Sequence, residues 1–252
     1  MSDTLKTIAC VSRTTLCEQI KELILAQLKK GELRPGDKLP AGEELARSLG
    51  VSAGTVRRAM EELVSEKILV RRQGSGTFVS SYRQAGYWNR FQNFQKSDGR
   101  LIVWRSKTIE AGRVPAPAAV AHAFGIAPGS GVIRALRHMF DSESGSLVGV
   151  DQLYLHPGHF PDNAADRLLE PLPQGESLYQ FYERAFGVAV VAAGNVLSAF
   201  VCSRQLDESL GKPGLEGKVL FQIVRIGRTY GHAPVEYRIE LTDASQTRIG
   251  FD

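Results

Sequence analysis

The sequence predicts a winged helix-turn-helix followed by an α+β domain with a central antiparallel sheet. Three observations predict this fold class. Residues 15–66 hold three helical segments with short connections, residues 67–80 hold two β-prone runs around a glycine-rich tip, and the rest mixes strand and helix patterns. The expected domains are 1–80 for the winged helix-turn-helix and 101–252 for the α+β domain, with a linker over 81–100.

The three predicted helices are marked at their ends. Thr15 and Glu18 form a capping box at the start of the first helix, and Gly31 closes it. The turn sequence ELRPGDKLP precedes a short helix in AGEELARSLG, and Ser52 is the expected N-cap of the third. The apolar stripes are Leu16, Ile20, Leu23, Ile24 and Leu28 in the first helix, and positions 56, 59, 60, 63 and 64 in the third. Two helices joined by a tight glycine-containing turn are typical of a helix-turn-helix.

A β-hairpin, or wing, is predicted in KILVRRQGSGTFVS. Residues 68–70 and 77–79 are β-prone and flank the tip at 73–76. Residues 81–100 are polar with scattered aromatic side chains and show no clear period, which predicts the linker.

The remaining chain alternates between strand and helix periods. Strands are expected near 101–109, 132–140, 147–155, 188–198, 219–228 and 235–241, and helices near 117–124, 162–169, 177–186 and 203–210. Short turns at DSESGS and TYGHAP join consecutive strands, which predicts an antiparallel sheet with helices packed on it.

Composition excludes several classes of protein. With 252 residues, 43% of them hydrophobic, the chain has no apolar run of about 18 residues and no signal-peptide pattern. We therefore expect a cytoplasmic protein without a membrane partner. Cys10, Cys17 and Cys202 lack C-x-x-C spacing, which predicts free thiols rather than a disulfide framework or a zinc site. The net charge is +4, and residues 1–80 hold 13 Lys and Arg against 10 Asp and Glu.

The expected partner of the helix-turn-helix and its wing is double-stranded DNA. Hydroxyl groups and open amides at the start of the third helix can bond phosphate oxygens, arginines one turn in can reach base edges, and glycines let the wing backbone approach closely. The expected DNA-binding residues are Ser52, Thr55, Arg57, Arg58, Arg71, Arg72, Gly74 and Gly76. The alternative is that the arginines form a solvated face, paired with Glu61 and Glu62 at i,i+4.

Both parts of the chain resemble known families. Residues 16–79, with GELRPGDKLP, ELARSLGVS, TVRRAMEELV and RRQGSGTFV, resemble the winged-helix domain of GntR-type bacterial transcription regulators. Residues 100–250, with VIRALRHMFDSESGSLVGVDQLYL, SLYQFYERAFG and APVEYRIEL, resemble the UTRA effector-binding domain of the HutC branch, a chorismate-lyase-like fold. We therefore expect a repressor that is released by a small-molecule metabolite effector. It should bind a palindromic operator as a homodimer, because two-fold DNA sites match two-fold proteins.

Two positions of the helix-turn-helix depart from the family. The resemblance implies an arginine that contacts DNA at the place of Glu43, and a second at the place of Ala53. Two hypotheses follow, that the operator differs from the usual one or that DNA affinity is weak.

The second domain offers a candidate effector site. Arg137 stands in an apolar strand row, and Asp151 stands among leucines on the next strand. The row comprises Ile133, Ala135 and Met139, and the leucines are Leu147, Leu153 and Leu155. The hairpin register decides whether the two charges face each other, and a buried Arg–Asp pair is the alternative to a ligand site.

The resemblance implies that Arg137, Asp151 and Glu236 line the effector pocket. Alternation places Glu236 on one side of its strand with Arg238 and Glu240, so exposure to solvent is the alternative for that side.

Met139 stands where relatives that bind phosphorylated sugars carry a second arginine. This difference favours a carboxylate or a neutral polar metabolite, with His138 or Arg134 near Arg137.

Catalytic motifs are not apparent. His156 and His159 form the only close histidine pair, in a Pro-Gly loop without a nearby Cys or acid at ligand spacing, so neither a metal nor a cofactor is expected. We predict that the protein is not an enzyme. The alternatives are a chorismate-lyase-type enzyme, and a GntR-like protein with lost or weak DNA binding that serves dimer assembly.

Overall fold

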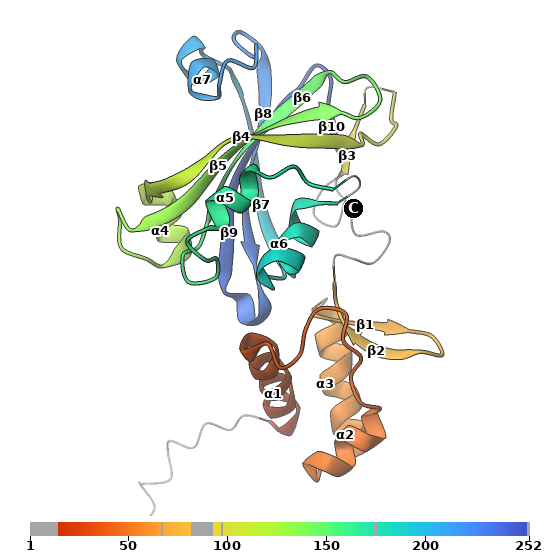
Figure 1. The fold of residues 1–252 in the computed structure, drawn as a ribbon. Helices are drawn as coiled ribbons and strands as arrows, with labels where there is room; N and C mark the ends of the chain where they lie inside the picture. Colours follow the sequence, from red (N-terminus) through yellow and green to blue (C-terminus); the bar gives the residue numbers. More distant parts are fainter. Residues whose placement is uncertain (1–14, 67, 82–92, 97, 174–175, 251–252) are drawn as a thin grey trace, which may run out of the picture. The chain divides into compact units, whose positions relative to one another are not determined.

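The structure is a computed structural model that describes residues 15–66, 68–81, 93–96, 98–173 and 176–250. The chain divides into two compact units between Ser80 and Ser81. Helices and a small hairpin make up the first unit, and a six-stranded antiparallel sheet with helices makes up the second (Figure 1). The predicted fold class is confirmed.

Capping signals determine where the helices of the first unit begin and end. These helices are α1 (Leu16–Lys30), α2 (Gly42–Leu49) and α3 (Ala53–Ser65). Thr15 and Glu18 each accept a hydrogen bond from the other's amide, as the capping box requires, and α1 ends at Gly31 in the left-handed conformation with φ 73°. Ser52 accepts from an amide of the first turn of α3, so its predicted role as N-cap is confirmed.

The apolar stripe of α3 supplies the core of the first unit. Its buried residues are Val56, Ala59, Met60 and Leu63, and α3 packs against both α1 and α2. The stripe expected for α1 is only partly correct, because Leu16 and Leu23 are 54% and 41% exposed. The buried side of α1 is formed by Ile20, Ile24 and Leu28.

The wing consists of β1 (Leu69–Arg72) and β2 (Gly76–Val79), which pair antiparallel as expected. The segment between α1 and α2 runs along β2. The amide of Leu39 donates to the carbonyl oxygen of Thr77 over 2.9 Å, and the amide of Val79 donates to the carbonyl oxygen of Asp37 over 2.8 Å. These bonds hold the hairpin to the helical part of the unit.

The second unit is built on one sheet with the strand order β4-β5-β6-β9-β8-β7. The strands are β4 (Trp104–Pro115), β5 (Gly131–Asp141), β6 (Leu147–Leu155), β7 (Ala192–Val201), β8 (Val219–Arg228) and β9 (Pro234–Asp243). Arg137 lies opposite Asp151, which lies opposite Glu240, so three charged residues line up across β5, β6 and β9. Two short strands that the sequence did not predict, β3 (Asn93–Gln95) and β10 (Arg248–Gly250), pair with each other.

Helices cover both faces of this sheet. They are α4 (Ala118–Phe124), α5 (Ala164–Leu169), α6 (Leu178–Phe186) and α7 (Arg204–Ser209), with a 3-10 turn η1 (Tyr230–His232) before β9. Ile133 and Leu153 belong to a core cluster with α5 and α6, and we call their side of the sheet the α6 face. On the opposite side, Val132 and Tyr154 pack against α4.

Two details differ from the sequence-based expectation. The β5–β6 register shifts between Gly149 and Leu147, so Leu147 packs in the cluster of the opposite face and not with Asp151 on the α6 face. The apolar run 188–191, read as the start of a strand, is buried in the core, and β7 begins only at Ala192.

In the described ranges, no helix is long and apolar enough to cross a membrane. Cys17 and Cys202 are free, buried thiols, as expected, whereas Cys10 lies outside the described residues.

Candidate functional site

The amino end of α3 is exposed. The Oγ of Ser52 accepts from the amide of Thr55 over 3.1 Å and lies 2.7 Å from its Oγ1. Ala53 and Gly54 occupy the first turn and are exposed. Amides of a first helical turn have no acceptor within the helix and carry partial positive charge, so this end can bind an anion.

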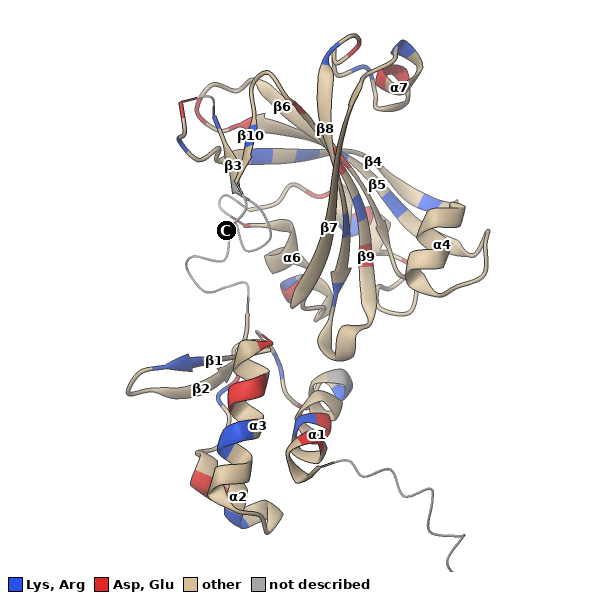
Figure 2. Ribbon diagram, turned by 180° about the vertical axis from the view of Figure 1, so that it is seen from behind, with Lys and Arg blue, Asp and Glu red and all other residues tan. Residues whose placement is uncertain are grey.

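Arg57 and Arg58 lie in the first half of α3, with side chains 75% and 77% exposed. Figure 2 marks basic residues on the ribbons of α3 and β1. Arg57 lies 3.9 Å from Glu61 and Arg58 lies 3.2 Å from Glu62. The ion pairs of the alternative interpretation are therefore present. Exposed pairs of this kind contribute little to stability, so a phosphate can replace the glutamate as the partner of either arginine.

The wing residues occupy the expected places. Arg71 is exposed and lies 4.0 Å from Glu61, and the guanidinium of Arg72 lies 4.4 Å from the ring centroid of Phe78. Gly74 and Gly76, at the tip, have φ of 71° and 116°, where a residue with a side chain would be strained.

Lys38 is a cation that sequence reasoning missed. Its backbone forms an isolated antiparallel β-bridge with Phe78 of β2. A Cβ added at Gly76 would lie 2.9 Å from Lys38 Cε. The side chain therefore lies along the wing beside the tip, and it is exposed. The signal was its position after Pro-Gly-Asp in the turn segment, but the pairing with β2 is visible only in three dimensions.

Glu43 and Ala53, the two departures from the family, are both exposed. Glu43 lies with Glu44 in the first turn of α2, where the helix dipole favours negative charge. This gives Glu43 a structural role at the start of α2.

Arg137 and Asp151 face each other on the α6 face. Arg137 Nη1 lies 3.3 Å from Asp151 Oδ2, and the two residues are 3% and 1% exposed. Arg137 Nη2 also bonds the hydroxyl of Ser106. Arg137 Nε and Asp151 Oδ1 have no hydrogen-bond partner among the described residues, so one buried donor and one buried acceptor remain in the pair.

Glu236 is fully buried beside this pair. Arg238 donates to both of its oxygens, over 3.0 and 2.8 Å, and the hydroxyls of Tyr179 and Tyr182 donate over 2.8 and 2.7 Å. Arg238 Nη1 also lies 3.6 Å from Asp151, which joins the three predicted effector residues into one network.

Burial and charge act in opposite directions on the pKa values of this network. Burial alone would raise the pKa of Glu236, but the charge of Arg238 and the hydrogen bonds from Arg238, Tyr182 and Tyr179 outweigh it and lower the pKa. Burial and the neighbouring Glu236 charge raise the pKa of Tyr179 to about 12 and that of Tyr182 well above its usual value. The glutamate is therefore a stable anion with protonated tyrosines as donors.

The alternative that β9 turns its charged side to solvent is wrong. Glu236, Arg238 and Glu240 are 0%, 8% and 2% exposed, because this side of β9 is the α6 face. Arg225 of β8 is buried there too, 3.8 Å from Glu240. The sequence did not identify Arg225, because the alternation of residues along β8 did not show which side of that strand lies on the α6 face.

The expected neighbours of Arg137 lie elsewhere. Arg134 and His138 alternate to the opposite face, where His138 Nε2 lies 2.9 Å from the carbonyl oxygen of Leu210 and Arg134 pairs with Glu110. Among described side chains, no group of three His, Cys, Asp or Glu could hold a metal ion.

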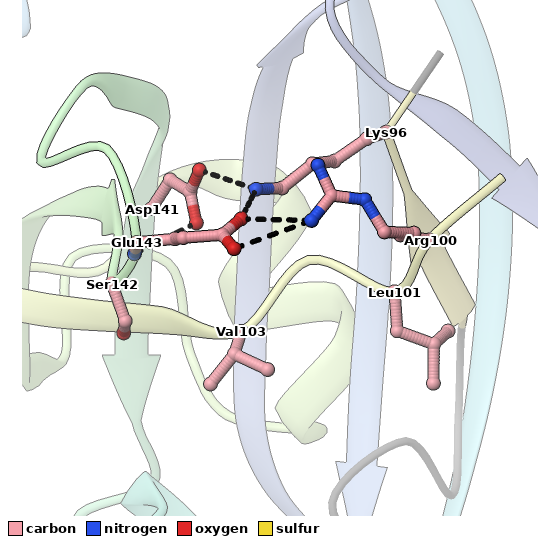
Figure 3. A pocket seen from close by; sticks show the side chains of 7 residues that line it. All are labelled: Lys96, Arg100, Leu101, Val103, Asp141, Ser142 and Glu143. Atoms are coloured by element: carbon pink, nitrogen blue, oxygen red, sulfur yellow. Dashed lines mark hydrogen bonds and ion pairs between the residues drawn. The ribbon is translucent and has the colours of Figure 1, made fainter. Parts of the chain in front are cut away.

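An open pocket of about 360 Å³ lies beside the β5–β6 turn (Figure 3). Lys96 lies 2.8 Å from Asp141 and also bonds Glu143, and Arg100 lies 3.2 Å from Glu143. The charges that line this pocket thus neutralise one another, which is a structural arrangement at a strand turn.

This cluster predicts sensitivity to acid. The hydrogen bond from Lys96 lowers the pKa of Asp141 from 3.8 to about 2, against the effect of burial. Because the pKa of Asp141 is lower in the folded protein than in the unfolded chain, the charged carboxylate stabilises the fold at pH values above about 3.8. This stabilisation is lost as the pH falls from about 3.8 to about 2. In acid unfolding followed by circular dichroism, Asp141→Asn should lose stability at pH 6 and show a shallower decline below pH 4, whereas Asp166→Asn, at an exposed carboxylate, should follow the unaltered protein. A steep, unchanged decline in Asp141→Asn would contradict the assignment.

A winged helix-turn-helix with exposed arginines on its third helix, joined to a separate α+β domain, is typical of DNA-binding regulators. Residues 16–79 match the family model described as bacterial regulatory proteins, gntR family, and residues 100–248 match the UTRA domain. The chain belongs to the GntR family of transcriptional regulators and, with its UTRA effector domain, to the HutC subfamily.

The similar proteins are named as transcriptional regulators. The "Probable fructoselysine utilization operon transcriptional repressor" of Escherichia coli (strain K12) is 28% identical over 249 residues, 96% of each chain. The histidine utilization repressor of Pseudomonas aeruginosa is 42% identical over 65 residues, 26% of each chain. The solved ligand-binding domain of a GntR-family regulator from Bordetella bronchiseptica is 28% identical, with a TM-score of 0.54 over 65% of this chain and 97% of that one.

These relatives are transcriptional regulators and not enzymes, which argues against the chorismate-lyase-type alternative. The two domains imply DNA and a small molecule as partners.

Proposed function

We propose that the protein is a cytoplasmic repressor that binds a palindromic operator as a homodimer and leaves it when a small-molecule effector binds. The observation that carries the proposal is the exposed amino end of α3, with Arg57 and Arg58 one turn in and the glycine-tipped wing in the same unit. The proposed DNA-binding residues are Ser52, Thr55, Arg57, Arg58, Arg71, Arg72, Gly74 and Gly76, and we add Lys38.

Each group has a distinct role on DNA. First-turn amides and the hydroxyls of Ser52 and Thr55 bond phosphate oxygens. Arg57 reaches a base edge in the major groove, while Arg58 and the wing cations neutralise phosphates. One unit carries only 13 basic against 10 acidic residues, so tight binding requires a second unit on the same duplex.

The proposed effector site is the network of Arg137, Asp151 and Glu236 on the α6 face. Among the described residues, Arg137 Nε and Asp151 Oδ1 have no hydrogen-bond partner, so they offer a donor and an acceptor to a ligand that carries both an acceptor and a donor group. Met139 lies on this face without charge, Arg238 is already bonded to Glu236, and Arg225 lies 3.8 Å from Glu240. The cation count therefore favours a carboxylate or neutral polar metabolite over a sugar phosphate.

Release follows from coupled equilibria. An effector that binds more tightly to the dimer arrangement unable to span two successive grooves shifts the population toward that arrangement. Because coupling is reciprocal, operator DNA must weaken effector binding by the same factor.

A metabolite screen tests this proposal. In thermal-shift assays, polar carboxylates should include a ligand that raises the melting temperature, and that ligand should weaken DNA binding about 5- to 150-fold. Arg137→Lys keeps the charge but loses the planar fork, so it should lose the response while still binding DNA. Strong stabilisation by a hexosamine phosphate would overturn the ligand class, and a stabilising ligand without effect on DNA would overturn the release step.

A second candidate function is dimer assembly without operator binding. Exposed Glu43 and Ala53, at the places of two expected arginines, favour this candidate. DNA that remains unshifted in gel assays at low salt would support it.

A further inference from the structure

Lys21 of α1 joins two carboxylates of the third helix. Its Nζ donates to Glu62 Oε2 over 3.1 Å and also bonds Glu66, the C-cap residue of α3. The side chain of Lys21 is 19% exposed, whereas that of Lys30, at the carboxyl end of the same helix, is 69% exposed. Water and salt screen a partly buried charge less than an exposed one, so the bond between α1 and Glu62 is less screened than the exposed pairs of α3.

Glu62 is shared between Lys21 and an arginine that is proposed to bind DNA. Its Oε2 accepts from Lys21, and its Oε1 accepts from Arg58 Nε over 3.2 Å. The hydrogen bond from Lys21 and, after it, the one from Arg58 lower the pKa of Glu62. Arg58 precedes Glu62 by four residues, which is the less favourable order for an ion pair on a helix, and its side chain is 77% exposed. Arg58 can therefore leave Glu62, which keeps Lys21 as a partner.

Glu61, the preceding residue, is held differently. It lies 3.9 Å from Arg57 and 4.0 Å from Arg71, and both of these arginines are proposed to bind DNA. When they turn to the duplex, Glu61 loses both of these ion pairs, and its carboxylate is left to water because its side chain is 54% exposed. Glu62 instead retains a pair with a residue of α1 that does not belong to the proposed DNA-binding surface.

We propose that Lys21 is a positioning residue for DNA binding, which holds the Glu62 carboxylate so that Arg58 is free to pair with a phosphate. This inference rests on the proposed function, because it concerns the state of Arg58 on the duplex. Without Lys21, release of Arg58 would leave the Glu62 carboxylate without either of these two cations, close to a negatively charged duplex. Repulsion between like charges would oppose that release, so Arg58 would stay with Glu62.

The salt dependence of DNA binding tests this role. Lys21→Met should weaken binding of the full chain to its own upstream DNA about two- to fivefold, the range of a single exposed ion pair. The slope of log K against log salt should become shallower by about one, because Arg58 then no longer neutralises a phosphate. A purely structural role of Lys21 would lower stability and leave this slope unchanged.

Two further variants show whether the effect passes through Glu62 and Arg58. Lys21→Met combined with Glu62→Gln lacks the carboxylate that holds Arg58, so affinity and slope should return to those of the unaltered protein. In a protein that already carries Arg58→Ala, Lys21→Met should change neither quantity.

Lys30→Met is the matched control. Lys30 also belongs to α1 and lies 4.0 Å from an acid, but that acid is Glu32, which lies outside α3. The variant loses the same charge as Lys21→Met and should bind DNA like the unaltered protein. Circular dichroism establishes that the variants are folded.

The possible results separate this inference from the proposed function. If Lys21→Met binds DNA with the affinity and slope of Lys30→Met, the role of Lys21 is overturned while DNA binding by α3 stands. Weakened binding that Glu62→Gln does not restore would overturn it too, since the loss would not come through Glu62. An unaltered protein that binds no DNA at the lowest salt would overturn both the inference and the proposed function.

Discussion

Glu236→Ala is expected to lower the free energy of unfolding of the second domain by about 3–5 kcal/mol, the cost of breaking a buried ion pair by removing one partner. Among the described residues, the negative partner that remains for the Arg238 guanidinium is Asp151, 3.6 Å away. It also removes the carboxylate that accepts from the buried hydroxyls of Tyr179 and Tyr182. Urea unfolding followed by circular dichroism measures the change.

Glu110→Ala is the matched control. Glu110 also pairs with an arginine, Arg134, over 3.0 Å, but its side chain is 64% exposed. Water can replace the lost partner there, so the expected loss is below about 1 kcal/mol. Equal losses in the two variants would show that the network around Glu236 does not hold the α6 face together.

Arg57→Ala is expected to weaken binding to the operator by about 5- to 150-fold, or about 1–3 kcal/mol, and to relax the preference for one base pair. Arg57 lies one turn inside α3 and is 75% exposed, so the loss reflects DNA contact and not folding. Fluorescence anisotropy with operator variants measures both affinity and preference.

Arg204→Ala in α7 is the control for that experiment. Arg204 is 76% exposed and pairs with Glu208 at i,i+4 over 3.3 Å, so its local setting matches that of Arg57 and Arg58, but it lies in the second unit. The Arg204→Ala variant should bind DNA with the affinity of the unaltered protein. If Arg57→Ala binds as tightly as Arg204→Ala, the arginines of α3 only form a solvated face with their glutamates.

Local signals made the first unit predictable. Thr15 and Ser52 cap helices through their own side chains, and Gly31 ends a helix through its own backbone, so neighbouring residues determine these boundaries. The Arg137–Asp151 pairing could be named as a possibility from alternation, but the turn register that decided it depends on the whole hairpin.

Long-range packing explains what the sequence did not yield. Alternation placed Glu236 and Arg238 on one side of β9, but only the packing of α6 shows that this side is buried. β3 and β10 are three-residue strands that pair with each other although they lie near opposite ends of the second domain's sequence. Lys38 pairs with Phe78 of the wing, 40 residues further along the chain. Such contacts leave no periodic signal in either segment.

The amino end of α3 and the wing should bind the backbone of a duplex. The most direct measurement is the association constant of the purified protein for its own upstream DNA at several salt concentrations between about 50 and 200 mM. We predict that log K falls linearly with log salt, with a slope that becomes shallower by about one when Arg58 is replaced by alanine. Binding that does not change with salt, or no binding at the lowest salt, would contradict the account.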